Sequence, residues 1–167
     1  MKLLRITVAV LILVALLAGC SLPGASGNAV NFYYSRVSFA YGGEDAVILL
    51  EQRDITGHEG DLKYILSLYL MGPLDEDLAA VFPVSTRLVG IRQEDSNLSV
   101  HLTPIAKSLS EGEFSLACSC LTMTCMDLTS CKQVTVVSGD RSLTLTTEDL
   151  LLLDDPISTE TQSEETK

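Results

Sequence analysis

The sequence is short of the residues and motifs that enzymes most often use. It holds two histidines, His58 and His101, and no Gly-x-Ser-x-Gly segment. A catalytic serine or cysteine needs a histidine that a third group orients. His58 lies in a glycine-flanked loop, and His101 alternates out of phase with its apolar neighbours Val100 and Leu102. We therefore expect both histidines to face solvent, and we expect the protein not to be an enzyme.

Basic residues are also scarce, with 11 Lys and Arg against 22 Asp and Glu and a formal charge of −11. Such a surface repels phosphate backbones and anionic lipid head groups, so we expect no nucleic-acid partner. Asp75, Glu76 and Asp77 are consecutive but lack the Asp-x-Asp-x-Asp-Gly pattern of a calcium loop. We expect them to form a solvated acidic surface rather than a metal site.

Four cysteines gather in the second half of the chain, without a Cys-x-x-Cys pair. On a helix, Cys118 and Cys120 point about 200° apart, so they cannot bind one zinc ion together. We expect all four thiols to be small buried hydrophobic groups, with no metal and no cofactor. The alternative is a disulfide, which an extracytoplasmic protein permits, and its first candidate pair is Cys125 with Cys131.

The N-terminus carries a targeting signal. Lys2 and Arg5 begin it, residues 6–17 are an unbroken apolar run, and Leu17-Ala18-Gly19-Cys20 closes it. The run is too short for a comfortable membrane span, and its end closely resembles the bacterial lipobox. The resemblance implies that Cys20 carries a diacylglycerol and anchors the mature protein on the extracytoplasmic face of the cell membrane. A plain secretory signal and a membrane-anchoring segment are the alternatives.

The chain divides into four parts on this interpretation. Residues 1–19 are the lipoprotein signal peptide, and their loss changes the formal charge to −13. Residues 20–28 form a short lipidated tether rich in Ser, Gly and Pro. Residues 29–153 form one domain, as the length of the chain favours, and no further apolar segment is long enough to span a membrane. Residues 154–167 are rich in Ser, Thr and Glu, and we expect this tail to be disordered.

The stretch from Asp61 to Thr103 has the clearest local signals. Apolar residues recur there at i, i+3, i+4 and i+7, which predicts an amphipathic helix through Leu62, Ile65, Leu66 and Tyr69. Asp61 can cap its start, and Gly72 followed by Pro73 predicts a sharp end. Alternation across residues 94–97 then predicts a half-buried hairpin, with Val89, Ile91, Leu98, Val100 and Leu102 on the buried face.

A second helix is predicted after Ser110. Ser110 and Glu113 fit a capping box, and Leu109 with Phe114 has the spacing of a hydrophobic staple. One apolar face follows, made of Phe114, Ala117, Cys118, Leu121, Cys125 and Leu128. Strands are predicted at 30–36, 46–53, 134–137 and 143–146. The expected fold is a two-layer α+β domain of order β-β-α-β-β-α-β-(β), with two helices packed on one mainly antiparallel sheet.

The order of these elements and motifs over residues from about 30 to 153 resembles that of the GerM domain, a protein family of sporulation and spore germination. Four segments carry the likeness: the helix end Leu70-Met71-Gly72-Pro73, the approach Phe82-Pro83 to Leu88, the strand Leu98–Thr103, and the strand Cys131–Val136 after a helix that holds Thr124. The sequence departs from the family pattern at Ser85, at His101 and in the position of the turn at Gly139.

The resemblance implies a membrane-anchored interaction or assembly module, similar in fold to ring-building modules and without catalytic residues. Its partners would be envelope proteins or further copies of itself, in sporulation, germination or other cell-envelope complexes. The alternative is a lipoprotein that captures a small molecule or a cell-wall fragment. That function would use the aromatic N-terminal strands, with Phe32, Tyr33, Tyr34, Phe39 and Tyr41 as a stacking platform.

Overall fold

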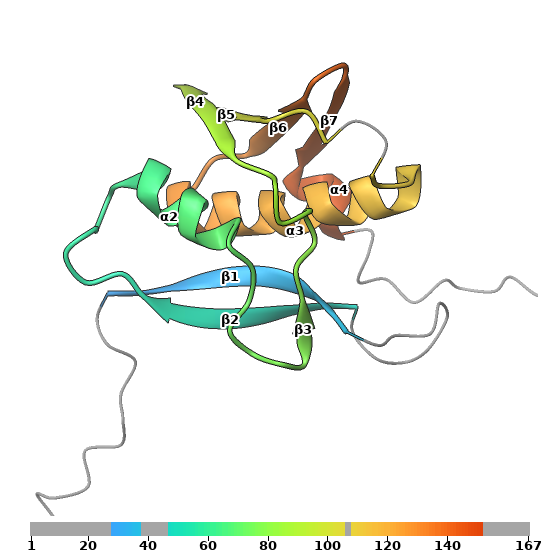
Figure 1. The fold of residues 1–167 in the computed structure, drawn as a ribbon. Helices are drawn as coiled ribbons and strands as arrows, with labels where there is room; N and C mark the ends of the chain where they lie inside the picture. The colour runs from blue at the N-terminus through green and yellow to red at the C-terminus, as the bar shows by residue number, and fades with distance from the viewer. Residues whose placement is uncertain (1–27, 38–46, 106–107, 152–167) are drawn as a thin grey trace, which may run out of the picture.

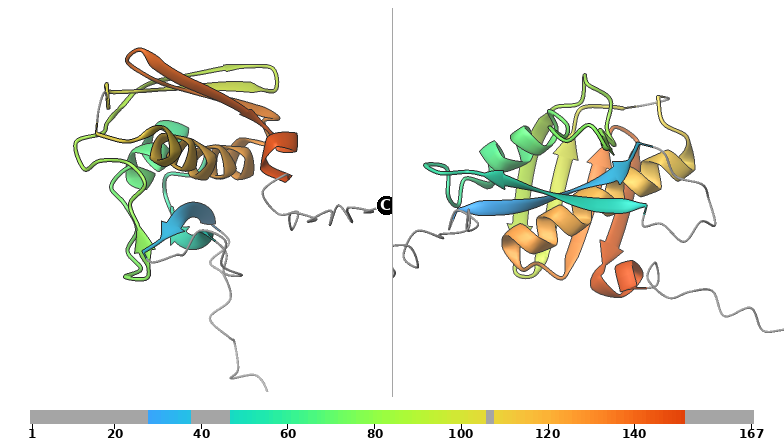
Figure 2. Two further views of the ribbon diagram at one scale, coloured as in Figure 1. Left: turned by 90° about the vertical axis from the view of Figure 1, so that its right-hand side faces the viewer. Right: turned by 90° about the horizontal axis from the view of Figure 1, so that it is seen from below.

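Two β-sheets enclose a layer of helices in the computed structural model, which describes residues 28–37, 47–105 and 108–151. Figures 1 and 2 show the helices between the sheets from the front and from the side. One sheet has the order β2-β1-β3, and the other has the order β4-β5-β6-β7. The α+β class is confirmed. The predicted two-layer arrangement on a single sheet is wrong, because the helix layer lies between two sheets.

The helices and strands occur in the predicted order, with two short elements added. The three-stranded sheet contains β1 (Ala29–Arg36), β2 (Ile48–Asp54) and β3 (Leu78–Ala79). The four-stranded sheet contains β4 (Leu88–Glu94), β5 (Asn97–Leu102), β6 (Gln133–Ser138) and β7 (Arg141–Thr146). The helices are α2 (Leu62–Tyr69), α3 (Glu111–Thr129) and α4 (Thr147–Leu151). Strand β3 and helix α4 are short, and the sequence patterns did not predict them.

Helix α2 forms where the apolar periodicity predicts it. The Asp61 carboxylate accepts a hydrogen bond from the Tyr64 N–H at 2.9 Å, as an N-cap does. Gly72 takes φ +95° after the last turn, in the left-handed region that L-residues avoid. Helix α2 buries Ile65, Leu66 and Tyr69. The Tyr69 ring stacks on Tyr34 of β1, with 4.9 Å between ring centroids.

The predicted hairpin is present as β4 and β5, with one residue displaced. Leu88 pairs with Leu102 and Gly90 pairs with His101, so Val89 is the extra residue of a β-bulge. The assignment of Val89 to the buried face is therefore wrong: the bulge turns it outward, and Leu88 takes the inner position. Strand β6 then runs parallel to β5, while β7 returns antiparallel to β6.

Helix α3 begins with the predicted capping box, since Ser110 and Glu113 satisfy each other's backbone N–H groups. It is buried on two opposite sides. The Thr124 hydroxyl accepts the Tyr33 N–H of β1 at 3.0 Å, whereas Cys118 lies near Arg141 of β7. Helix α3 thus contributes to the core against both sheets, which explains why a single apolar face did not describe it. No helix among the described residues is long and apolar enough to cross a membrane.

Candidate interaction surfaces

The four described cysteines are buried free thiols, so their predicted burial is confirmed. Burial raises the pKa of Cys118 to about 12 and that of Cys120 to about 12, which keeps both thiols protonated. Cys131 directly follows Ser130, the left-handed residue that ends α3. Such helix ends often pack the next residue against the last turn. Burial raises the pKa of Cys125, and the nearby Cys131 raises it further. The Cys125–Cys131 disulfide stays a prediction.

The histidines lie on the surface, as predicted. His101 points out from the uncovered face of the four-stranded sheet, because Val100 and Leu102 take the inner positions. His58 stacks on Tyr64 with 3.6 Å between ring centroids. In the part of the chain that the structure describes, no group of three or more His, Cys, Asp or Glu side chains is placed to hold a metal ion.

The aromatic residues of the N-terminal strands do not form an exposed platform in the described residues. Phe32 and Tyr34 are fully buried against α2, and Tyr33 is half-buried. Phe39 and Tyr41 lie outside the described residues, as do the lipidation candidate Cys20 and the predicted tail.

A buried ion pair on β2 fixes the chain that leaves α2. Arg53 and Glu51 form this pair with side chains only 7% and 10% exposed. Arg53 Nη2 donates to the Gly72 carbonyl at 2.7 Å. Glu51 Oε2 accepts the N–H groups of Leu74 and Asp75 at 2.7 and 2.8 Å. These charge-assisted hydrogen bonds hold the connection between α2 and β3 from both sides of Pro73.

The connection held in this way exposes large apolar side chains. Met71 and Leu74 are 81% and 79% exposed, and Val84, in the connection from β3 to β4, is 86% exposed. The two connections lie close together, because a Cβ at Gly72 would lie 3.3 Å from the Ala80 Cβ. We call Met71, Leu74 and Val84, together with the adjacent acidic residues 75–77, the loop surface. Figure 1 shows the two connections on either side of β3.

The predicted acidic segment is confirmed as exposed, since Asp75, Glu76 and Asp77 all face solvent. Its place beside exposed apolar side chains was not predicted. Exposed apolar side chains beside charged residues occur on surfaces that bind other proteins. Leu74 directly precedes the acidic run, and Glu51, in a distant strand, accepts its backbone N–H.

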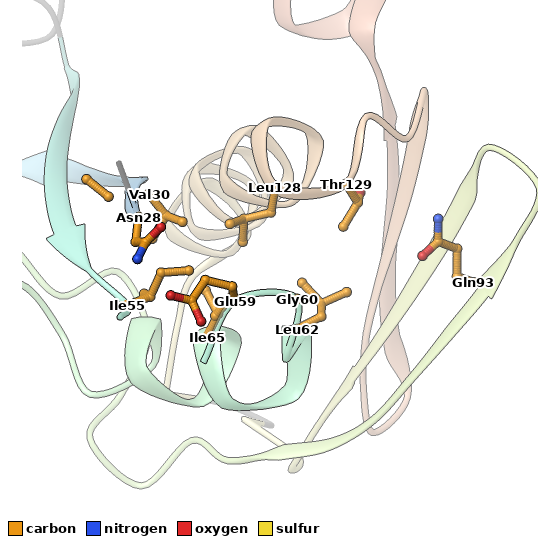
Figure 3. Close-up of a pocket in the computed structure, with 11 residues that line it drawn as sticks. Asn28, Val30, Ile55, Glu59, Gly60, Leu62, Ile65, Gln93, Leu128 and Thr129 are labelled. Atoms are coloured by element: carbon orange, nitrogen blue, oxygen red, sulfur yellow. The ribbon is translucent and has the colours of Figure 1, made fainter. Parts of the chain in front are cut away.

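A groove of about 460 Å³ opens at the other end of α2. Its apolar walls come from four elements or their ends, and include Val30, Ile55, Leu62, Ile65 and Leu128. Polar groups at its border include Asn28, Glu59, Gln93 and Thr129. Figure 3 shows these side chains around the opening, with the Glu59 carboxylate between the start of α2 and the start of β1. The sequence analysis did not predict this groove.

Solved structures match parts of this chain. The first GerMN domain of the sporulation protein GerM from Bacillus subtilis matches 68% of this chain and 86% of its own, with 17% identity and a TM-score of 0.50. Its tandem GerMN domains match 74% of this chain and 43% of their own, with 17% identity and a TM-score of 0.47. A candidate lipoprotein from Clostridium perfringens matches 72% of this chain and 88% of its own, with 16% identity and a TM-score of 0.46.

The match to the first GerMN domain identifies the class of fold. The described part of the chain forms a GerMN-like domain, so the resemblance stated from the sequence is confirmed for the fold. At this level of identity the likeness concerns the fold alone. No family model matches the sequence, and no curated protein matches it.

Proposed function

We propose that this protein is a lipoprotein, anchored through Cys20 on the extracytoplasmic face of the cell membrane, whose GerMN-like domain is a non-catalytic interaction module. The loop surface is the observation that carries the proposal. The backbone around its Leu74 is fixed by the buried pair of Glu51 and Arg53, so the exposure of Leu74 is built into the fold. A pre-ordered contact surface loses little conformational entropy on binding.

The charge of the chain indicates which kind of partner the loop surface would bind. Asp75, Glu76 and Asp77 border the apolar side chains, and the mature chain carries a formal charge of −13. Two copies would repel each other through such a surface, whereas a partner with Lys or Arg around an apolar contact would be attracted. We therefore favour a different envelope protein as the partner over self-association. Tethering confines the domain to the membrane plane, which raises its effective concentration there.

The GerMN-like fold supports a place in an envelope complex of spore formation or germination, since a fold neighbour is a domain of a sporulation protein. Residues 17–20 support the anchor by their resemblance to the lipobox. Lipid attachment is tested by labelling cells with an alkynyl fatty acid. We expect label and membrane fractionation in the wild type, and loss of the label in Cys20→Ala. A Cys20→Ala protein that kept the label would contradict the anchor.

Sedimentation tests the choice of partner. We expect the chain from residue 20 onward, with Cys20→Ser to keep it free of lipid, to remain a monomer at high concentration with and without reductant. Association in reductant would favour self-assembly over a different partner. Association that reductant removes would show that thiols we place in the core are accessible.

A further inference from the structure

The groove beside the start of α2 has the size and lining of a small-ligand site. Its volume of about 460 Å³ falls within the range of roughly 300–1,000 Å³ that is usual for such sites. Ile55 and Ile65 are buried at its base, and Val30, Leu62 and Leu128 are half-buried around it. An apolar guest would remove the remaining exposed surface of these side chains from water, which is favourable.

The one ionisable side chain among the residues that line the groove is Glu59. Hydrogen bonds from its own N–H and from the Gly57 N–H lower the pKa of this carboxyl group, so it is negatively charged at neutral pH. Figure 3 shows the carboxylate among Asn28, Ile55 and Ile65, at the border of the apolar walls. A positive group bound there would keep its charge near solvent while its apolar part entered the groove.

A second negative feature borders the groove. Leu128 and Thr129, at the C-terminal end of α3, contribute to its lining. A helix carries a partial negative charge at this end, which basic side chains in the last turn usually offset. Helix α3 has no basic residue in its last turn and instead carries Asp127 there. The start of α2, which also borders the groove, has the opposite partial charge, but the Asp61 carboxylate caps it. On balance, Glu59 and the end of α3 favour a cation over an anion.

We propose that the groove binds a small amphipathic cation, with an ammonium or guanidinium group beside Glu59 and an apolar chain against Ile55, Ile65 and Leu128. Such a ligand matches both the apolar walls and the negative border. This inference goes beyond the proposed function, because the groove and the loop surface lie at opposite ends of α2 and involve different residues.

The test compares three probes that share one apolar chain: octylammonium, octanol and octanoate. Each is titrated into the ¹⁵N-labelled chain from residue 20 onward, with Cys20→Ser, below its micelle-forming concentration. We expect amide shifts from octylammonium to concentrate at the groove residues. Octanol should bind more weakly than octylammonium, and octanoate should bind most weakly of the three.

Two variants that each remove one negative charge distinguish binding at the groove from an effect of the overall charge of the protein. Glu59→Gln should weaken octylammonium binding about two- to fivefold, the effect of one exposed ion pair, and leave octanol binding unchanged. Glu76→Gln, on the loop surface, should change neither. Equal affinity for the three probes, or shifts spread over the whole surface, would overturn the proposal. Tighter binding of acetyl-Leu-Lys-Leu-amide than of octylammonium would assign the groove to a protein segment and would also overturn it.

Discussion

Helices α2 and α3 lie in the same layer, but they contribute to different properties of the molecule. Helix α3 is enclosed by both sheets, and Cys118, Cys120, Leu121 and Thr124 are fully buried along it. Helix α2 is buried on one side only, and its opposite side, including Lys63 and Ser67, faces solvent. The comparison indicates that α3 connects the sheets and dominates stability, whereas α2 positions the groove at its start and the loop surface at its end.

The largest expected loss of stability comes from a substitution in α3. Leu121→Ala should lower the free energy of unfolding by about 4 kcal/mol, because it leaves a cavity in a fully buried site between the sheets. Leu62→Ala in α2 is the matched control and should cost less, since Leu62 is half-buried. Urea unfolding measures both. Equal losses of unfolding free energy would contradict the conclusion that α3 contributes more to stability than α2.

The next largest change in stability is expected from a substitution that frees the connection after α2. Arg53→Met should cost about 3 kcal/mol, because it leaves the Glu51 carboxylate buried without its cation. Amide exchange at Leu74 and Asp75 should also quicken, since Glu51 accepts their N–H groups. Arg92→Met removes an exposed ion pair, with side chains 73% and 65% exposed, and should cost less than about 1 kcal/mol. Unchanged amide exchange in Arg53→Met would show that the pair does not hold the loop surface.

A smaller effect is expected at Gly72. Gly72→Ala should cost about 1–2 kcal/mol, because the residue has φ +95° and its new Cβ would lie 3.3 Å from the Ala80 Cβ. Gly112→Ala, in the first turn of α3, meets no atom within 4 Å and should be neutral or stabilising. Thermal unfolding of the two variants distinguishes these outcomes. A tolerated alanine at Gly72 would contradict the fixed geometry of the helix end.

The smallest effect is at the start of α3, where Ser110→Ala should cost about 1 kcal/mol through the lost cap. Hydrogen bonds from the Ser110 side chain and backbone lower the pKa of Glu113. A lowered pKa in the folded state stabilises the fold above the unfolded-state pKa, and this contribution disappears as the pH falls through the folded-state pKa. The stability difference between wild type and Glu113→Gln should therefore narrow in acid. A difference that did not change with pH would contradict the role of the carboxylate.

The two helices also show what the sequence can reveal. Helix α2, its Asp61 cap and its Gly72 end follow from neighbouring residues, and so do the hairpin and the capping box at Ser110. The separate three-stranded sheet could not be inferred from neighbouring residues. The side of α3 that this sheet covers includes Thr124, which is polar. Its hydroxyl donates to the Cys120 carbonyl and accepts the Tyr33 N–H, so it is satisfied inside the protein. Pattern analysis assigns such a residue to solvent.

The surfaces were harder to predict than the fold. Leu74 is exposed because Glu51 and Arg53, in a strand far back in the sequence, hold the backbone around it. The groove joins residues that lie far apart in the sequence, from Asn28 to Thr129. Neither arrangement has a local signature. The burial of Cys118 and Cys125 was predictable, because both lie on the apolar face of the predicted helix.

Site-specific photo-crosslinking from the loop surface, in cells that carry the full-length protein, tests the central claim most directly. A photoreactive amino acid replaces Leu74, and a matched one replaces Ser142 on the uncovered face of the four-stranded sheet. We expect one discrete product from position 74, formed with a different envelope protein, absent from position 142, and lost when Met71 and Val84 are changed to Ser. Crosslinking from position 142 as strong as that from position 74, or none from position 74, would contradict the assignment of the loop surface as the contact.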